Sequence, residues 1–248
     1  MNILAVDTAG KSAGVAVLQD GRLTYECFLD VGFTHSETLL PMIDAALKAV
    51  GLTPAQIDLY GVNAGPGSFT GLRIGLAAVK GLAFTRNTPC APVSTLEALA
   101  LPHTGEGTVL CALDARRSQV YWAAFDLASH TRLTPDAAAA VDSLAAFVEN
   151  CKKPLFFVGD GAQLCYNKYG QLPGVVRAPA ALCGGRAAGV ALAAQAMQAA
   201  GQAVPPAALL PSYHRLSQAE RERAERLAAE AARTEIPEDT AKGKDQHQ

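Results

Sequence analysis

The glycine-rich segment at residues 65–75 has the residue types that could bind a charged ligand. It reads Gly-Pro-Gly-Ser-Phe-Thr-Gly-Leu-Arg-Ile-Gly, and glycines at a helix start can leave backbone N–H groups free to face an anion. The segment has no lysine at the spacing of the phosphate-binding P-loop, which excludes that motif. Gly71 and Gly75 also share one helix face, although glycine within a helix costs roughly 1 kcal/mol relative to alanine. We therefore favour close packing of this helix against another helix over phosphate binding.

Asp7 and Thr8 follow the first apolar run of the chain and precede a loop. A carboxylate at this corner can stand beside a metal-bound phosphate group, or it can be a polar residue that ends a strand. Taken alone, the pair favours the structural role. One candidate site, a residual nucleotide or anion site, stays open, and its residues are Asp7, Thr8, Gly65, Gly67 and Ser68.

The cysteines and histidines do not form a metal-binding motif. The six cysteines include no Cys-x-x-Cys pair, and none of the five histidines has another histidine or a cysteine three or four residues away. We expect reduced thiols, no metal and no cofactor.

The elements that must position these residues alternate between strands and helices. Apolar runs predict three strands joined by tight turns, at residues 3–6, 13–18 and 23–29. Thr34 and Glu37 have the spacing of a capping box, which predicts a helix from there to about Val50. A strand at residues 57–63 leads into the glycine-rich segment and a second helix that ends near Phe84.

The pattern predicts an α/β protein of two lobes. Three strands, then helix, strand and helix, followed by a second α/β region, is the order of the actin, sugar-kinase and chaperone-ATPase fold, in which each lobe is a mixed sheet with helices. We predict four segments: an N-terminal lobe at 1–101, a second lobe at 108–185, C-terminal helices that pack back on the lobes at 186–233, and a disordered tail at 234–248.

Charge and hydropathy exclude two classes of protein. The formal net charge of −2 argues against a dedicated nucleic-acid binder, which carries a strongly basic surface. Residues 187–214 lack acidic and basic side chains, but they are rich in alanine and contain glutamine and proline, unlike a membrane span. The N-terminus has no basic region before its apolar run and does not resemble a signal peptide. We expect a soluble, cytoplasmic protein with no membrane partner.

Several motifs of the chain resemble the TsaB family. The clearest are Ala64–Gly75 and the earlier segment His35–Ile43. Shorter matches lie at residues 3–8, 93–100, 114–116, 211–215 and 217–221. His214 is a departure, because the family usually has a leucine before the arginine.

The resemblance implies a role in making threonylcarbamoyladenosine beside the anticodon of tRNA. TsaB is the non-catalytic dimerisation subunit that binds and activates its catalytic paralogue TsaD, and the ATPase TsaE joins them. The implied partners are therefore a TsaD-like protein and a TsaE-like ATPase, with tRNA contacted at most indirectly. A homodimer would use the same helices as the paralogue. The partner interface is expected at His35, Leu39, Leu40, Ile43, Leu47, Thr70, Gly71, Ile74, Gly75 and Ala78.

Two departures from the paralogue indicate that the chain has no catalytic residues of its own. Thr95 and Leu99 stand where the paralogue has its metal-binding His-x-x-x-His motif, and leucine cannot bind a metal. Asp114 and Ala115 stand in the second phosphate loop, where a carboxylate repels phosphate and glycine is expected. A small-molecule kinase or ATPase of the same fold remains the alternative. A stand-alone hydrolase has no Gly-x-Ser-x-Gly motif to support it.

Overall fold

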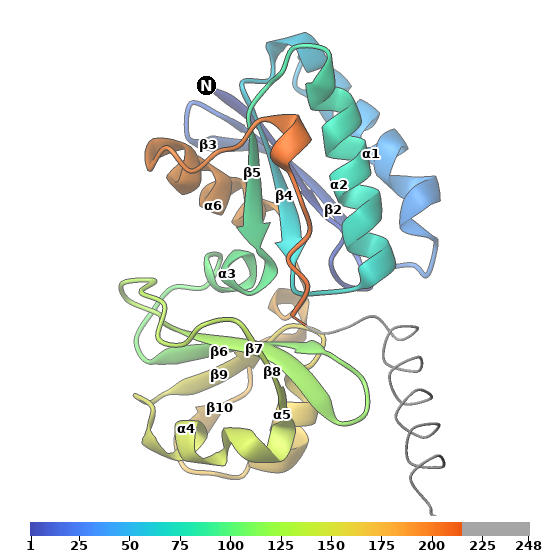
Figure 1. Ribbon diagram of the computed structural model, residues 1–248. Helices are drawn as coiled ribbons and strands as arrows, with labels where there is room; N and C mark the ends of the chain where they lie inside the picture. The colour runs from blue at the N-terminus through green and yellow to red at the C-terminus, as the bar shows by residue number, and fades with distance from the viewer. Residues whose placement is uncertain (215–248) are drawn as a thin grey trace, which may run out of the picture. The chain divides into compact units, whose positions relative to one another are not determined.

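The computed structural model describes residues 1–214, which form two five-stranded sheets with helices on their faces (Figure 1). The helix predicted at residues 217–233, the motif match at 217–221 and the tail at 234–248 lie outside the described residues. The two mixed sheets with flanking helices confirm the predicted α/β fold class. The division into four segments stays a prediction.

The first sheet has the strand order β3-β2-β1-β4-β5. Strands β1 (Asn2–Asp7), β2 (Ala13–Gln19) and β3 (Arg22–Leu29) form the predicted antiparallel meander. Asp20 and Gly21 both have positive φ, which is the turn geometry that matches the twist of a tight hairpin. Strands β4 (Leu59–Gly65) and β5 (Cys90–Ser94) add in parallel beyond β1. The carboxyl ends of β1, β4 and β5 therefore lie at one edge of the sheet.

Helices cover both faces of the first sheet. Leu4 and Val6 of β1 pack with α1 (His35–Ala49) and α2 (Phe69–Phe84), whereas Ile3 and Ala5 point to the other face. The capping box at the start of α1 is confirmed, since the Thr34 N–H donates to Glu37 Oε2 at 3.2 Å. The helix continues through Pro41.

The alanine-rich helix α6 (Ala187–Ala199) packs very closely on the second face of this sheet. A Cβ on Gly61 of β4 would lie only 2.8 Å from Ala194 Cβ. A Cβ on Gly189 would overlap the Ala98 carbonyl oxygen in α3 (Thr95–Ala100). Small residues therefore form this part of the core because larger ones do not fit.

The second sheet has the order β10-β9-β6-β7-β8. Its long central hairpin is β6 (Thr108–Asp114) and β7 (Gln119–Asp126), and the remaining strands are β8 (Ala137–Ala140), β9 (Leu155–Val158) and β10 (Val175–Val176). Apolar residues of α3 pack on one face. Residues of α4 (Ala145–Asn150) and α5 (Ala162–Tyr169) pack on the other. The helix α3 thus contacts both sheets, and Figure 1 shows it between them.

Within residues 1–214, no helix is both long and apolar enough to cross a membrane.

Replacement of two helical glycines by alanine should change the free energy of unfolding in opposite directions. Gly189→Ala should lower the free energy of unfolding by about 2 kcal/mol or more, because the new Cβ meets backbone that cannot move aside cheaply. Gly81→Ala in α2 is the matched control, since its Cβ would have no atom within 4 Å, and it should raise stability by up to about 1 kcal/mol. Urea denaturation measures both. Equal stability of the two variants would contradict the close packing of α6 on α3.

Candidate functional site

The glycine-rich turn lies between the end of β4 and the start of α2. Ser68 is the N-cap of α2, and its Oγ accepts from the Gly71 N–H at 3.2 Å. The Ser68 N–H donates to the Ala9 carbonyl at 2.8 Å. Both N–H groups are therefore used inside the chain, which leaves neither of them to bind an anion.

The first two glycines of the segment allow two other parts of the chain to pass close by. A Cβ on Gly67 would lie 2.6 Å from the Ala9 carbonyl oxygen, and one on Gly65 would overlap the Ser212 carbonyl oxygen. The Ser212 N–H also donates to the Ala64 carbonyl at 2.7 Å. Two of the residues expected at an anion site, Gly65 and Gly67, are thus packed against the chain itself, whereas Ser68 is exposed.

Gly71 and Gly75 provide the close approach that their spacing predicts, but the neighbour is a strand end rather than a helix. A Cβ on Gly71 would overlap the Thr8 carbonyl oxygen, and a Cβ on Gly75 would overlap Thr8 Oγ1. The Thr8 hydroxyl donates to the Gly71 carbonyl at 2.8 Å. Both glycines are buried in this chain, so the prediction that they face a partner needs correction.

The residues expected at the partner interface divide into buried, exposed and half-buried residues. Leu39, Ile43 and Leu47 are buried against the first sheet and, like the two glycines, present nothing to the surface. Leu40 is 55% exposed and Thr70 is also exposed, while the remaining residues are half-buried. The half-buried residues are His35, Ile74 and Ala78.

Two large exposed side chains near these helices were missed from the sequence. Phe33, just before α1, is 67% exposed, and Phe84, the last residue of α2, is 76% exposed. We name the exposed residues Phe33, Leu40 and Phe84, together with the half-buried Ile74 and Ala78, the α1–α2 face. The sequence signal for these two side chains was a large apolar residue next to, or at, the end of a predicted helix.

An aromatic and cationic cluster holds residues 211–213 against the start of α2. The Phe69 and Tyr213 rings stack with centroids 4.5 Å apart. Arg73 Nε donates to the Tyr213 hydroxyl at 2.9 Å, and its guanidinium lies within 6 Å of both ring centroids. These contacts fix the segment that covers Gly65.

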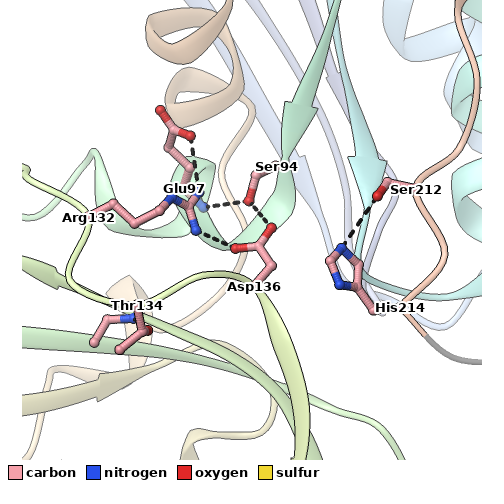
Figure 2. A network of polar contacts seen from close by, with 8 residues as sticks. Ser94, Glu97, Arg132, Thr134, Asp136, Ser212 and His214 are labelled. Carbon is pink, nitrogen blue, oxygen red and sulfur yellow. Dashed lines mark hydrogen bonds and ion pairs between the residues drawn. The ribbon is translucent and has the colours of Figure 1, made fainter.

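Figure 2 shows a polar network that joins the two sheets. Ser94, at the end of β5, donates from its hydroxyl to Asp136 Oδ2 at 2.6 Å. Arg132 pairs with the other oxygen of Asp136 and, at 3.1 Å, with Glu97 Oε2. Asp136 and Arg132 precede β8 of the second sheet, so the network ties that sheet to β5 and α3 of the first.

A small cavity of about 80 Å³ lies where the two sheets face each other. Its lining includes Asp7, the last residue of β1, and Asp160, the second residue after β9. Burial raises the pKa of Asp7 to about 6, partly offset by hydrogen bonds from the Ala9 N–H and the Asn63 amide. Desolvation also raises the pKa of Asp160.

Thr95 and Leu99, where the resemblance implies the paralogue's histidine motif, both line this cavity. Among residues 1–214, no group of three or more histidine, cysteine or acidic side chains could hold a metal ion. In the loop at residues 114–118, the Arg116 N–H donates to Asp114 Oδ1 at 2.7 Å and the Ala115 N–H donates to the Gln119 carbonyl at 2.9 Å. These two donors are again satisfied by the chain.

Ser212 and His214 are the described pair that most nearly resembles a hydrolase nucleophile and base. Their Oγ and Nε2 atoms are 3.4 Å apart (Figure 2), and both residues are exposed. No described carboxylate bonds to the His214 ring to orient it. The pair therefore lacks the geometry of a catalytic triad.

Comparison with known proteins assigns the family. A sequence model of the family described as TsaD, tRNA N6-adenosine threonylcarbamoyltransferase, matches residues 31–237. The chain belongs to the TsaD family. Its sequence is also similar to proteins named tRNA threonylcarbamoyladenosine biosynthesis protein TsaB, which confirms the resemblance drawn from its motifs.

Two TsaB relatives and one solved structure give the extent of the similarity. TsaB of Haemophilus influenzae is 40% identical over 126 residues, which cover 49% of this chain and 52% of that protein. TsaB of Escherichia coli K12 is 38% identical over 128 residues, with 50% and 55% covered. The matches thus span about half the length of these two relatives. A Pseudomonas aeruginosa protein described as similar to the peptidase YeaZ superposes with a TM-score of 0.73 at 28% identity, covering 86% of this chain and 99% of that one.

A double-mutant cycle should separate the two glycine contacts with Thr8. Gly75→Ala should lower the free energy of unfolding by about 2 kcal/mol, and much less in a Thr8→Ala background, because the obstructing atom is the Thr8 hydroxyl oxygen. Gly71→Ala should show no such rescue, because its obstruction is the Thr8 backbone. Urea denaturation of the single and double variants measures the coupling. Equal rescue at both glycines would contradict the geometry.

Asp136→Ala should destabilise the chain through the network between the sheets. The variant removes the partner of Ser94 and leaves Arg132 with one carboxylate fewer in a part-buried site, so a loss of about 2 kcal/mol is expected. Asp44→Ala is the control, because its ion pair with Lys48 is exposed and should contribute less than about 0.5 kcal/mol. Thermal and urea unfolding give both values. An Asp136→Ala loss no larger than that of Asp44→Ala would show that the network adds little to the stability of the chain.

Proposed function

We propose that this chain is a non-catalytic subunit that binds and activates a TsaD-like threonylcarbamoyltransferase in the cytoplasm. Its role is in the modification of tRNA to threonylcarbamoyladenosine next to the anticodon. The names of the TsaB relatives support the process. A TsaE-like ATPase is proposed as the third component, with tRNA contacted at most indirectly.

The α1–α2 face is the observation that carries the proposal. Exposed Leu40 lies on α1 and exposed Phe84 on α2, which contact each other, and exposed Phe33 lies just before α1. Apolar side chains of this size at a surface favour a protein partner. The helices themselves are anchored to the first sheet by their buried residues, so the face is preformed. A homodimer through this face would compete with the TsaD-like partner.

The hydrogen bonds in the turn before α2 and in the loop after β6 support a non-catalytic role. The N–H groups of Ser68 and Gly71 donate to atoms of the same chain, and Asp114 occupies the second loop. A kinase or ATPase of this fold would need such donors for its phosphates. The isolated chain is therefore expected neither to bind nor to hydrolyse Mg-ATP.

Binding to the TsaD-like protein of the same cell tests the proposal. Leu40→Arg should weaken the complex by tenfold or more, because it places an unpaired charge in an apolar contact. Leu192→Arg is the matched control, since Leu192 is 40% exposed on α6, on the opposite face of the first sheet, and should bind as the unmodified chain does. Circular dichroism confirms folding, and calorimetry measures the affinity.

The activity of the partner gives the second readout. Threonylcarbamoyl transfer to tRNA by the TsaD-like protein should rise when this chain is added and should not rise with Leu40→Arg at the same concentration. Unchanged affinity for Leu40→Arg would remove the α1–α2 face from the interface. Transfer by this chain alone would contradict the non-catalytic role.

A further inference from the structure

Residues 209–213, which we name the strap, lie beside α2, and Figure 1 shows them on the opposite side of that helix from α1. Leu209, at one end of the strap, is buried in the core that includes residues of α2. At the other end, the Tyr213 ring stacks on the ring of Phe69, the first residue of α2. Both ends are therefore fixed against the first sheet and its helix, so the outer side of the strap is preformed.

The strap leaves two large side chains at the surface. Leu210 is 65% exposed, and Tyr213 is 41% exposed although its ring already packs on Phe69. Phe84, at the end of α2, is exposed as well. Exposed apolar side chains of this size favour contact with another protein.

The charged side chains of this surface have one sign. Arg73 and Lys80 are seven residues apart, which places them on the same side of α2, and Arg86 follows the end of the helix. Arg73 Nε donates to the Tyr213 hydroxyl, so this basic side of α2 is the side that faces the strap. Neither 59–96 nor 161–214 contains an acidic residue. The strap and α2 thus both come from stretches of the chain without a carboxylate side chain.

A surface with charges of one sign does not pair well with a copy of itself. Two-fold symmetry brings the same patch of both subunits together, so the three cations would face one another, and like charges across an interface oppose binding. Three cations in a chain of net charge −2 also differ from the extended basic surface of a nucleic-acid binder. The surface therefore fits a different protein, with an acidic and apolar contact region.

This inference rests on the proposed function and extends the contact described there. We propose that the strap and the basic side of α2 form a second contact surface for the TsaD-like protein, in addition to the α1–α2 face. The partner contributes carboxylates opposite Lys80 and Arg86 and an apolar region that covers Leu210. Since α2 belongs to both surfaces, one partner can reach both at once.

Calorimetry of the full chain with the TsaD-like protein of the same cell tests the proposal. Leu210→Ser should weaken the complex about tenfold, because it removes the most exposed apolar side chain of the strap. Leu192→Ser on α6 is its matched control and should bind as the unmodified chain does. Lys80→Glu should also weaken the complex about tenfold, because it places a carboxylate opposite carboxylates. Lys168→Glu, at an exposed position on α5, is the control with the same change in net charge. Circular dichroism confirms that each variant is folded.

The ionic strength gives a second readout, which separates the cations from the leucine. Salt screens the attraction between exposed charges, so the association rate should fall as sodium chloride rises from about 50 to about 500 mM. In Lys80→Glu this dependence on salt should be lost or reversed. Leu210→Ser should keep it, because the variant leaves every charge in place.

The outcomes separate this inference from the proposed function. Binding that Leu40→Arg weakens, with unchanged affinity in both Leu210→Ser and Lys80→Glu, would keep the α1–α2 face and overturn the second surface. An unmodified chain that does not bind would contradict the proposed function and the second surface together. Binding of tRNA by the isolated chain that Lys80→Glu abolishes would assign the cations to RNA and overturn the proposal. Self-association that Leu210→Ser abolishes would show that the strap contacts a second copy instead.

Discussion

The contact between helix α2 and the end of strand β1 is the constraint on which the rest of the structure depends. Thr8 occupies the space that side chains at positions 71 and 75 would need, and its hydroxyl bonds to the Gly71 carbonyl. This contact sets the depth of α2 on the sheet and places the preceding turn against Ala9. It also fixes which side of α2 faces outward. The α1–α2 face and the covered glycine-rich turn both follow from the position of one threonine.

The order of strands and helices could be predicted because local patterns determine it. The meander follows from short apolar runs and a tight turn, and the start of α1 follows from Thr34 and Glu37. Two short strands were missed. β8 consists of four alanines, and β10 has two residues, so neither has a periodic pattern that a sequence could reveal.

The contacts of the site were harder to predict, because the spacing of residues in the sequence does not identify which part of the chain packs against them. Two glycines four residues apart indicate close approach, but the same spacing fits another chain, a helix or, as here, the residue after a strand. In α1, the apolar residues Leu39 and Leu40 are adjacent, and only the packing decides that the first is buried and the second exposed. Ser94 and Asp136 are 42 residues apart, and neither has a local signal for the bond that joins them.

The chain's own atoms occupy part of the place where the sequence left an anion site open. Backbone carbonyls of Ala9 and Ser212 lie against Gly67 and Gly65. Thr95 and Leu99, where the resemblance implies the paralogue's histidine motif, line the cavity. The interior that remains is small, acidic and partly apolar, which differs from an open nucleotide cleft.

The position of α6 in the chain has a consequence for synthesis on the ribosome. One face of the first sheet is covered by residues 187–199, although the strands of that sheet end at Ser94. During translation, about a hundred further residues must be made before this apolar face can be covered. The nascent N-terminal sheet therefore has an uncovered surface while the second sheet is being completed. Such a chain folds late and depends on contacts that are distant in sequence, which makes the unfinished sheet a natural binding site for chaperones.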